Sequence, residues 1–112
     1  MNILVVDDEP LIHLSIEKLI LASSEDCQVS HAYNGQQMLE LLKSQRFQLA
    51  YVDIKMPGLT GLEAIRLAKE ASPSTRYYIM TGFDEFEYAK QAVKLKVEDY
   101  LMKPLDQKTI WE

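Results

Sequence analysis

Five short segments rich in β-branched and aromatic side chains recur along the chain, and each predicts a β-strand. They cover residues 2–6, 27–33, 47–52, 77–80 and 100–102. The segment at 47–52 is apolar except for Gln48, which is typical of a strand covered on both faces in a parallel sheet. The segment at 27–33 alternates between polar and apolar residues, as a half-buried edge strand does.

Between these segments, apolar residues recur three and four positions apart, a spacing that predicts helices. The helical segments are 11–20, 38–42, 62–68, 86–95 and a short final one at 107–112. Thr60, followed three residues later by Glu63, predicts a capping box at the start of the third helix. Strands and helices that alternate with short connections predict a parallel sheet with helices on both faces, a three-layer α/β/α fold.

Composition narrows the class of protein. The 112 residues predict one domain spanning 1–112, and 47% hydrophobic residues suffice for a core. A net charge of −5 opposes direct binding to a phosphate backbone.

The chain has neither a membrane-length apolar stretch nor a signal peptide, so we expect a cytoplasmic location and no membrane partner. The last helix is short, so we expect it to be truncated and an output domain to lie outside this chain.

Polar residues of complementary kinds follow the predicted strands. Asp7 and Asp8 end the first strand, Asp53 the third, Thr81 the fourth and Lys103 the fifth. In open parallel sheets the ligand crevice lies at these ends. Three converging carboxylates need a cation among them, and oxygen-only ligands favour Mg²⁺, or Mn²⁺ in its place. A hydroxyl and an ammonium beside them suit a phosphoryl group.

Each of these residues also has a purely structural interpretation. Asp7, Asp8 and Asp53 could cap helices, Thr81 could bond the backbone, and Lys103 could be a solvated strand end. We favour one shared functional site, because the structural interpretation requires five such residues to converge by accident.

Five motifs in this order resemble the receiver domain of two-component response regulators. They are Val5-Val6-Asp7-Asp8-Glu9, Val52-Asp53-Ile54-Lys55-Met56-Pro57-Gly58, Thr60-Gly61, Met80-Thr81-Gly82 and Tyr100-Leu101-Met102-Lys103-Pro104. The resemblance implies a flavodoxin-like (βα)5 fold, a doubly wound parallel sheet of five strands in the order 2-1-3-4-5. It also implies that a partner histidine kinase phosphorylates Asp53.

The resemblance assigns a role to individual residues of this chain. Asp8 contacts Mg²⁺ directly, Asp7 mostly through water, and Asp53 is both acceptor and metal ligand. The backbone carbonyl of Lys55 is the remaining protein ligand. Two further roles follow: Thr81 and Lys103 hold the phosphoryl group, and Thr81 and Tyr100 act as the switch.

A further resemblance concerns output. Residues 82–90 are similar to receivers joined to helix-turn-helix DNA-binding domains of the AraC type, which implies transcriptional regulation through a domain absent from this chain. Phosphorylation is then expected to change the face built by the fourth helix, fifth strand and fifth helix and to favour a homodimer. The charged residues of that face are Glu87, Lys90, Lys94, Asp99 and Lys103.

A rival function is a Mg²⁺-dependent phosphohydrolase that forms an aspartyl-phosphate, since that chemistry also needs Asp, Mg²⁺, Thr and Lys. The chain has no second acid two residues beyond Asp53 and no inserted segment to enclose a substrate. We therefore favour a switch that catalyses only its own phosphorylation and dephosphorylation, and not an enzyme.

Overall fold

A parallel five-stranded sheet organises the computed structural model, which describes residues 1–23, 26–54, 56, 60–82, 99–103 and 105. The strands are β1 (Asn2–Val6), β2 (Gln28–Ala32), β3 (Leu49–Asp53), β4 (Arg76–Thr81) and β5 (Asp99–Met102). Their order is β2-β1-β3-β4-β5, with every neighbouring pair parallel. The strand order implied by the resemblance is confirmed.

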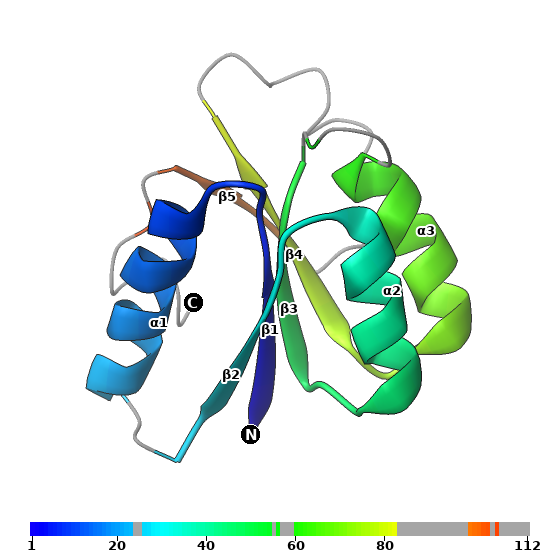
Figure 1. Cartoon of the computed structure of the whole chain (residues 1–112), viewed down its shortest axis with the longest axis horizontal. Helices are drawn as coiled ribbons and strands as arrows, with labels where there is room; N and C mark the ends of the chain where they lie inside the picture. Colours follow the sequence, from blue (N-terminus) through cyan, green and yellow to red (C-terminus); the bar gives the residue numbers. More distant parts are fainter. Residues whose placement is uncertain (24–25, 55, 57–59, 83–98, 104, 106–112) are drawn as a thin grey trace.

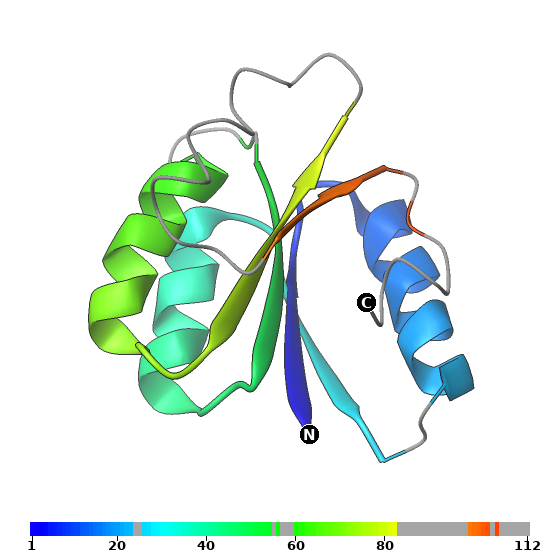
Figure 2. The same ribbon diagram turned by 180° about the vertical axis from the view of Figure 1, so that it is seen from behind.

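Helices cover both faces of this sheet (Figures 1 and 2). They are α1 (Pro10–Ser23), α2 (Gly35–Ser44) and α3 (Gly61–Ala71). Helix α1 lies on one face, and α2 and α3 lie together on the other. The three-layer prediction is thus confirmed for the described helices, none of which is long and apolar enough to span a bilayer. The predicted helices at 86–95 and 107–112 lie outside the described residues.

Alternation along β1 divides the core into two halves. Leu4 and Val6 belong to the cluster that faces α2 and α3, whereas Ile3 and Val5 belong to the cluster that faces α1. All four side chains are fully buried. Because successive strand residues point to opposite faces, a continuously apolar strand such as β1 lies at the centre of a sheet covered on both sides.

Side-chain caps set where two of the helices begin. The Asn34 side chain accepts a hydrogen bond of 2.8 Å from the backbone nitrogen of Gln37 at the start of α2. At α3, Thr60 Oγ1 accepts from the backbone nitrogen of Glu63 at 3.2 Å and donates to the Glu63 carboxylate at 3.1 Å. The predicted cap by Thr60 at the start of α3 is confirmed, with the Glu63 carboxylate bonded to the Thr60 hydroxyl and not to its backbone nitrogen as in a full capping box.

Candidate functional site

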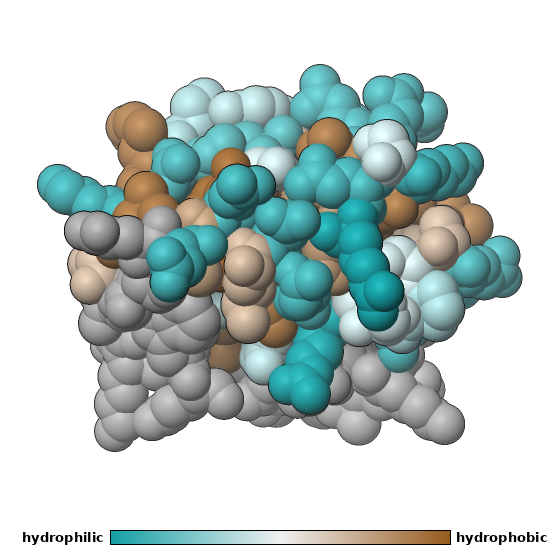
Figure 3. Space-filling model, turned by 90° about the horizontal axis from the view of Figure 1, so that it is seen from below, coloured by the Kyte–Doolittle hydropathy of each residue, from teal (hydrophilic) through white to brown (hydrophobic). Residues whose placement is uncertain are grey.

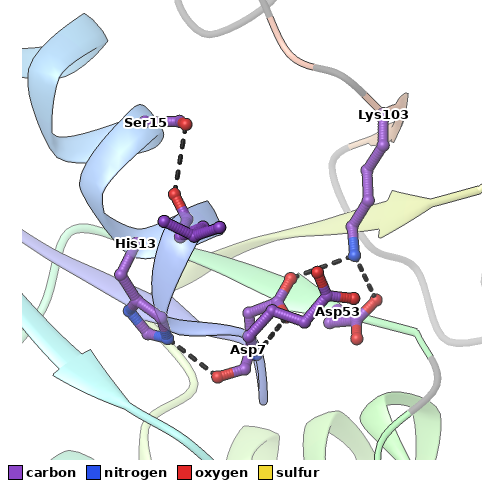
Figure 4. Close-up of polar contacts among 7 residues, drawn as sticks. Asp7, His13, Ser15, Asp53 and Lys103 are labelled. Atoms are coloured by element: carbon purple, nitrogen blue, oxygen red, sulfur yellow. Dashed lines mark hydrogen bonds and ion pairs between the residues drawn. The ribbon is translucent and has the colours of Figure 1, made fainter.

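The candidate site lies at the carboxyl edge of the sheet. Asp7 directly follows β1, Asp53 is the last residue of β3, and Lys103 directly follows β5. The parallel register sets Val6 opposite Val52, so β1 and β3 end at the same level. Figure 4 shows the side chains of Asp7, Asp53 and Lys103 turned toward one another. The structure therefore brings together residues that the sequence placed at separate strand ends.

Asp7 is fully buried and held at several atoms. Its backbone nitrogen donates to the Ala32 carbonyl at 3.2 Å, and its Oδ1 accepts from the Glu9 backbone nitrogen at 2.9 Å. The second contact is a local turn just before α1. Because Glu9 precedes that helix, Asp7 does not cap it as the structural interpretation supposed, but this oxygen does have a structural role. The other oxygen, Oδ2, remains for the site.

Lys103 bridges the two buried carboxylates. Its Nζ lies 3.0 Å from Asp53 Oδ1, to which it donates a hydrogen bond, and 3.0 Å from Asp7 Oδ2 as an ion pair. Burial by itself lowers the pKa of Lys103, but the contacts with Asp53 and Asp7 outweigh it and the pKa is raised. The interpretation of Lys103 as a solvated strand end is wrong, because its ammonium is paired with the carboxylates of Asp7 and Asp53.

The three acidic side chains form a cluster of the kind that holds a divalent cation. Asp7, Asp8 and Asp53 each offer an oxygen, and these oxygens lie within 4.8 Å of one another. Asp7 and Asp53 are buried, and Asp8 is exposed. Asp7 Oδ2 lies beside the Lys103 ammonium as an ion pair but makes no hydrogen bond with any described residue, and a buried carboxylate oxygen in that condition suits a hard cation such as Mg²⁺. The residues present therefore fit the expected metal.

The backbone after Asp53 is held in place by neighbouring segments. The Ile54 nitrogen donates to the Met80 carbonyl, and the Gly61 nitrogen donates to the Ile54 carbonyl, both at 3.1 Å. A β-carbon on Gly61 would collide with the Asp53 carbonyl oxygen and lie 2.9 Å from the Asp53 carbonyl carbon. Only glycine permits this approach, which explains why glycine follows the Thr60 cap.

Three residues that the sequence analysis did not single out connect to this site. His13, on α1, places its Nε2 2.8 Å from the Asp7 carbonyl oxygen, and its Nδ1 lies 2.8 Å from Nδ1 of His31 on β2. Nε2 of His31 lies 3.3 Å from Glu17 Oε2. The available signal was the position of His13 three residues before Ile16, on the apolar side of the helix.

The remaining predicted site residues are only partly described. The backbone of Thr81 ends β4 and that of Tyr100 lies in β5, where it pairs with Ile79. Their side chains are outside the description, as are those of Asp99 and the whole of Lys55. The predicted roles of Thr81, Tyr100 and the Lys55 carbonyl therefore stay predictions.

Comparison with known proteins gives consistent results. The sequence pattern of the response regulator receiver domain matches residues 3–112. The transcriptional regulatory protein YesN of Bacillus subtilis is 37% identical over 110 residues, which cover 97% of this chain and 30% of YesN. This chain thus spans less than a third of the length of that relative.

Solved structures agree with the sequence comparison. The receiver domain of AraT, a response regulator from Geobacillus stearothermophilus, superposes with a TM-score of 0.87 at 36% identity, covering 96% of this chain and 84% of that one. A response regulator from Burkholderia pseudomallei, solved with a phosphorylated aspartic acid and a calcium ion, has a TM-score of 0.82 at 28% identity, covering 97% and 63%.

Proposed function

This chain belongs to the response regulator receiver domain family, and on that premise we propose that it is a phosphoacceptor switch in which Asp53 receives a phosphoryl group from a sensor histidine kinase. One observation carries the proposal: a nearly buried carboxylate ends β3 with a lysine cation 3.0 Å away and two further acids beside it. A structural salt bridge needs one acid for one base. The surplus of acids supports a site that takes an additional cation.

Asp53, Lys103 and Thr81 would each have a separate role in phosphoryl transfer. An Asp53 carboxylate oxygen attacks phosphorus, forming a P–O bond as the P–N bond to the donor histidine breaks. Lys103 lies close enough to Asp53 to balance charge on the phosphoryl oxygens, and Thr81 at the end of β4 supplies a hydroxyl. The protein transfers the group to itself and returns it to water, so we do not propose an enzyme acting on a separate substrate.

Asp8, Asp53 and the Lys55 carbonyl would hold Mg²⁺ or Mn²⁺, with Asp7 acting mostly through water. The metal supplies positive charge that neutralises the oxygens of the transferring group. Binding in the range typical of a partly hydrated ion would stabilise the folded chain by mass action.

The output step extends the same proposal. YesN is named as a transcriptional regulatory protein, and this chain spans 30% of its length. In an intact protein, phosphorylation would draw Thr81 toward the phosphoryl group, and Tyr100 would turn inward to fill the space. The face around β5 would then favour a homodimer that pairs DNA-binding output domains.

The direct test is incubation with acetyl phosphate and Mg²⁺, followed by intact-mass measurement. We expect one phosphoryl group per chain in the wild type, loss of labelling in Asp53→Asn, and normal labelling in Asp26→Asn, an exposed acid that serves as the matched control. Sustained release of many phosphates per chain would instead support the phosphohydrolase. An unlabelled wild type would overturn the proposal.

The dimer requires its own test on the full-length protein. Its mass in solution should increase with beryllofluoride, and Tyr100→Ala should reduce that increase. A mass that is unchanged by beryllofluoride, or a dimer indifferent to Tyr100→Ala, would contradict the proposed switch.

A further inference from the structure

A chain of polar contacts runs from the candidate site to the surface through α1 and β2. It begins at the Asp7 carbonyl oxygen, 2.8 Å from His13 Nε2, and passes from His13 Nδ1 to His31 Nδ1, also 2.8 Å. It ends where His31 Nε2 lies 3.3 Å from Glu17 Oε2. His13 is 3% exposed, whereas the side chains of His31 and Glu17 are 24% and 35% exposed. The buried end contacts the phosphoacceptor site, and the other end meets water.

The group at the buried end dictates where the His13 hydrogen lies. A carbonyl oxygen only accepts hydrogen bonds, so Nε2 of His13 must carry hydrogen. The contact between the two Nδ1 atoms needs one hydrogen as well. A neutral His13 with its hydrogen on Nε2 can only accept at Nδ1, so His31 supplies the hydrogen between the two rings.

The hydrogen between the two rings belongs to His31. Burial lowers the pKa of His13, against the hydrogen bond with the Asp7 backbone, which raises it. His31 is partly exposed and faces the Glu17 carboxylate. His13 is then neutral with its hydrogen on Nε2, and it accepts the His31 Nδ1 hydrogen on its own Nδ1. A neutral His13 can donate to Asp7 only in this tautomer.

This tautomer completes the restraint on Asp7. The nitrogen of Asp7 is tied to Ala32, its Oδ1 to the Glu9 nitrogen, and its carbonyl to His13. With those three atoms fixed, Oδ2 has little freedom except to face Lys103 and the acid cluster. The Tyr33 ring, with its centroid 4.3 Å from that of His13, packs against the imidazole and restricts its rotation.

We infer that His13 is a positioning residue of the phosphoacceptor site, and that His31 acts by fixing the tautomer through which His13 holds Asp7. The inference rests on the proposed function, because it concerns the geometry of the acids that would bind Mg²⁺. Groups that hold metal ligands from behind typically change metal affinity or activity by about 10- to 100-fold when they are removed.

Two substitutions separate positioning from ordinary packing. His13→Gln places an amide N–H near the position of Nε2 and keeps the donor, whereas His13→Met fills similar space without one. We expect His13→Met to weaken Mg²⁺ binding, measured by calorimetry on the folded protein, by about tenfold. His13→Gln should restore most of that affinity. The rate of labelling by acetyl phosphate at subsaturating Mg²⁺ should follow the same order.

A measurement on the wild type needs no variant. Long-range proton–nitrogen NMR at neutral pH should show His13 with hydrogen on Nε2 only and His31 with hydrogen on Nδ1. A His13 that carries its hydrogen on Nδ1, or on both nitrogens, would overturn the inference.

Failure of the inference can be told apart from failure of the proposed function. If the wild type binds Mg²⁺ and is labelled, but His13→Met binds Mg²⁺ equally well, the inference alone is wrong. If the wild type neither binds Mg²⁺ nor is labelled, both are wrong.

Discussion

Lys103 donates a 3.0 Å hydrogen bond to Asp53 while its ammonium also neutralises Asp7, so one cation serves two buried carboxylates. Lys103→Met should therefore lower stability in EDTA by about 3 kcal/mol, as expected when one partner of a buried ion pair is removed. Mg²⁺ should recover part of that loss by replacing the missing charge. Urea unfolding with EDTA and with Mg²⁺ measures both effects.

The exposed residue Lys18 provides the control for this substitution. Lys18→Met should change stability little, with or without metal. A Lys103→Met protein as stable as wild type in EDTA would mean that the two acids do not depend on this cation.

Gly61 lies so close to the Asp53 backbone that the direction in which Gly61→Ala changes stability is informative. Alanine for glycine within a helix usually stabilises by up to about 1 kcal/mol. Here the added carbon would lie 3.0 Å from Ile54 Cα and collide with the Asp53 carbonyl oxygen. We expect Gly61→Ala to destabilise by about 2 kcal/mol and to weaken Mg²⁺ binding, as measured by thermal unfolding and calorimetry. A stabilised variant would contradict the close approach.

Tyr77 should impose an alkaline limit on stability. Its hydroxyl donates to the Ser72 carbonyl at 2.9 Å, and burial raises its pKa above the ordinary 10.0, against opposing contacts with Thr75 and Ser72. The folded state therefore holds the proton more tightly than the unfolded state does. The contribution of the Tyr77 hydroxyl to the free energy of unfolding is therefore complete below about pH 10. It is lost as pH rises through the pKa of Tyr77 in the folded state.

The corresponding variant is Tyr77→Phe. It should lose about 1 kcal/mol at neutral pH, and its difference from wild type should narrow as pH rises above 10.0. Urea unfolding at several pH values tests both points. A difference that widens in alkali would show that the sign is wrong. Tyr51, on the other face of the sheet, also has a pKa raised by burial, and Tyr51→Phe should show a similar narrowing.

Thr75 offers a substitution that separates stability from function. It lies just before β4, at the end of the sheet opposite the site, where the coloured surface is mainly hydrophilic (Figure 3). Its Oγ1 donates to the Phe47 carbonyl at 2.8 Å and lies 2.6 Å from Ser72 Oγ. Thr75→Val should destabilise by about 2 kcal/mol and leave Mg²⁺ affinity unchanged. A weakened affinity would mean that the two ends of the sheet are coupled.

The sequence predicted the strands and the residues at their ends because alternation and turn residues are local properties. Asp7, Asp53 and Lys103 could be assigned to one edge as soon as the sheet was taken to be parallel. Strand order was different: nothing within β2 specifies that it pairs with β1, and this came from the resemblance.

Contacts that depend on side-chain direction were beyond the sequence. Lys103 could have extended into water, and only the buried acids around it determine that it turns inward. The link from His13 to His31 joins a helix to an edge strand, and no spacing rule predicts it. The sequence offered a structural and a functional interpretation of Asp7 as alternatives. In the structure, Oδ1 has a structural role and Oδ2 faces the candidate site.

The site also has a consequence for folding order. Asp53 and Lys103 are 50 residues apart, so their pairing requires closure of a long loop and comes late in assembly. Until β5 docks on β4, the acids at the ends of β1 and β3 lack the lysine that balances them. Binding of a divalent cation would relieve that repulsion in the incomplete chain. Refolding with Mg²⁺ should therefore be faster than with EDTA, making the metal an aid to assembly as well as to the proposed phosphorylation.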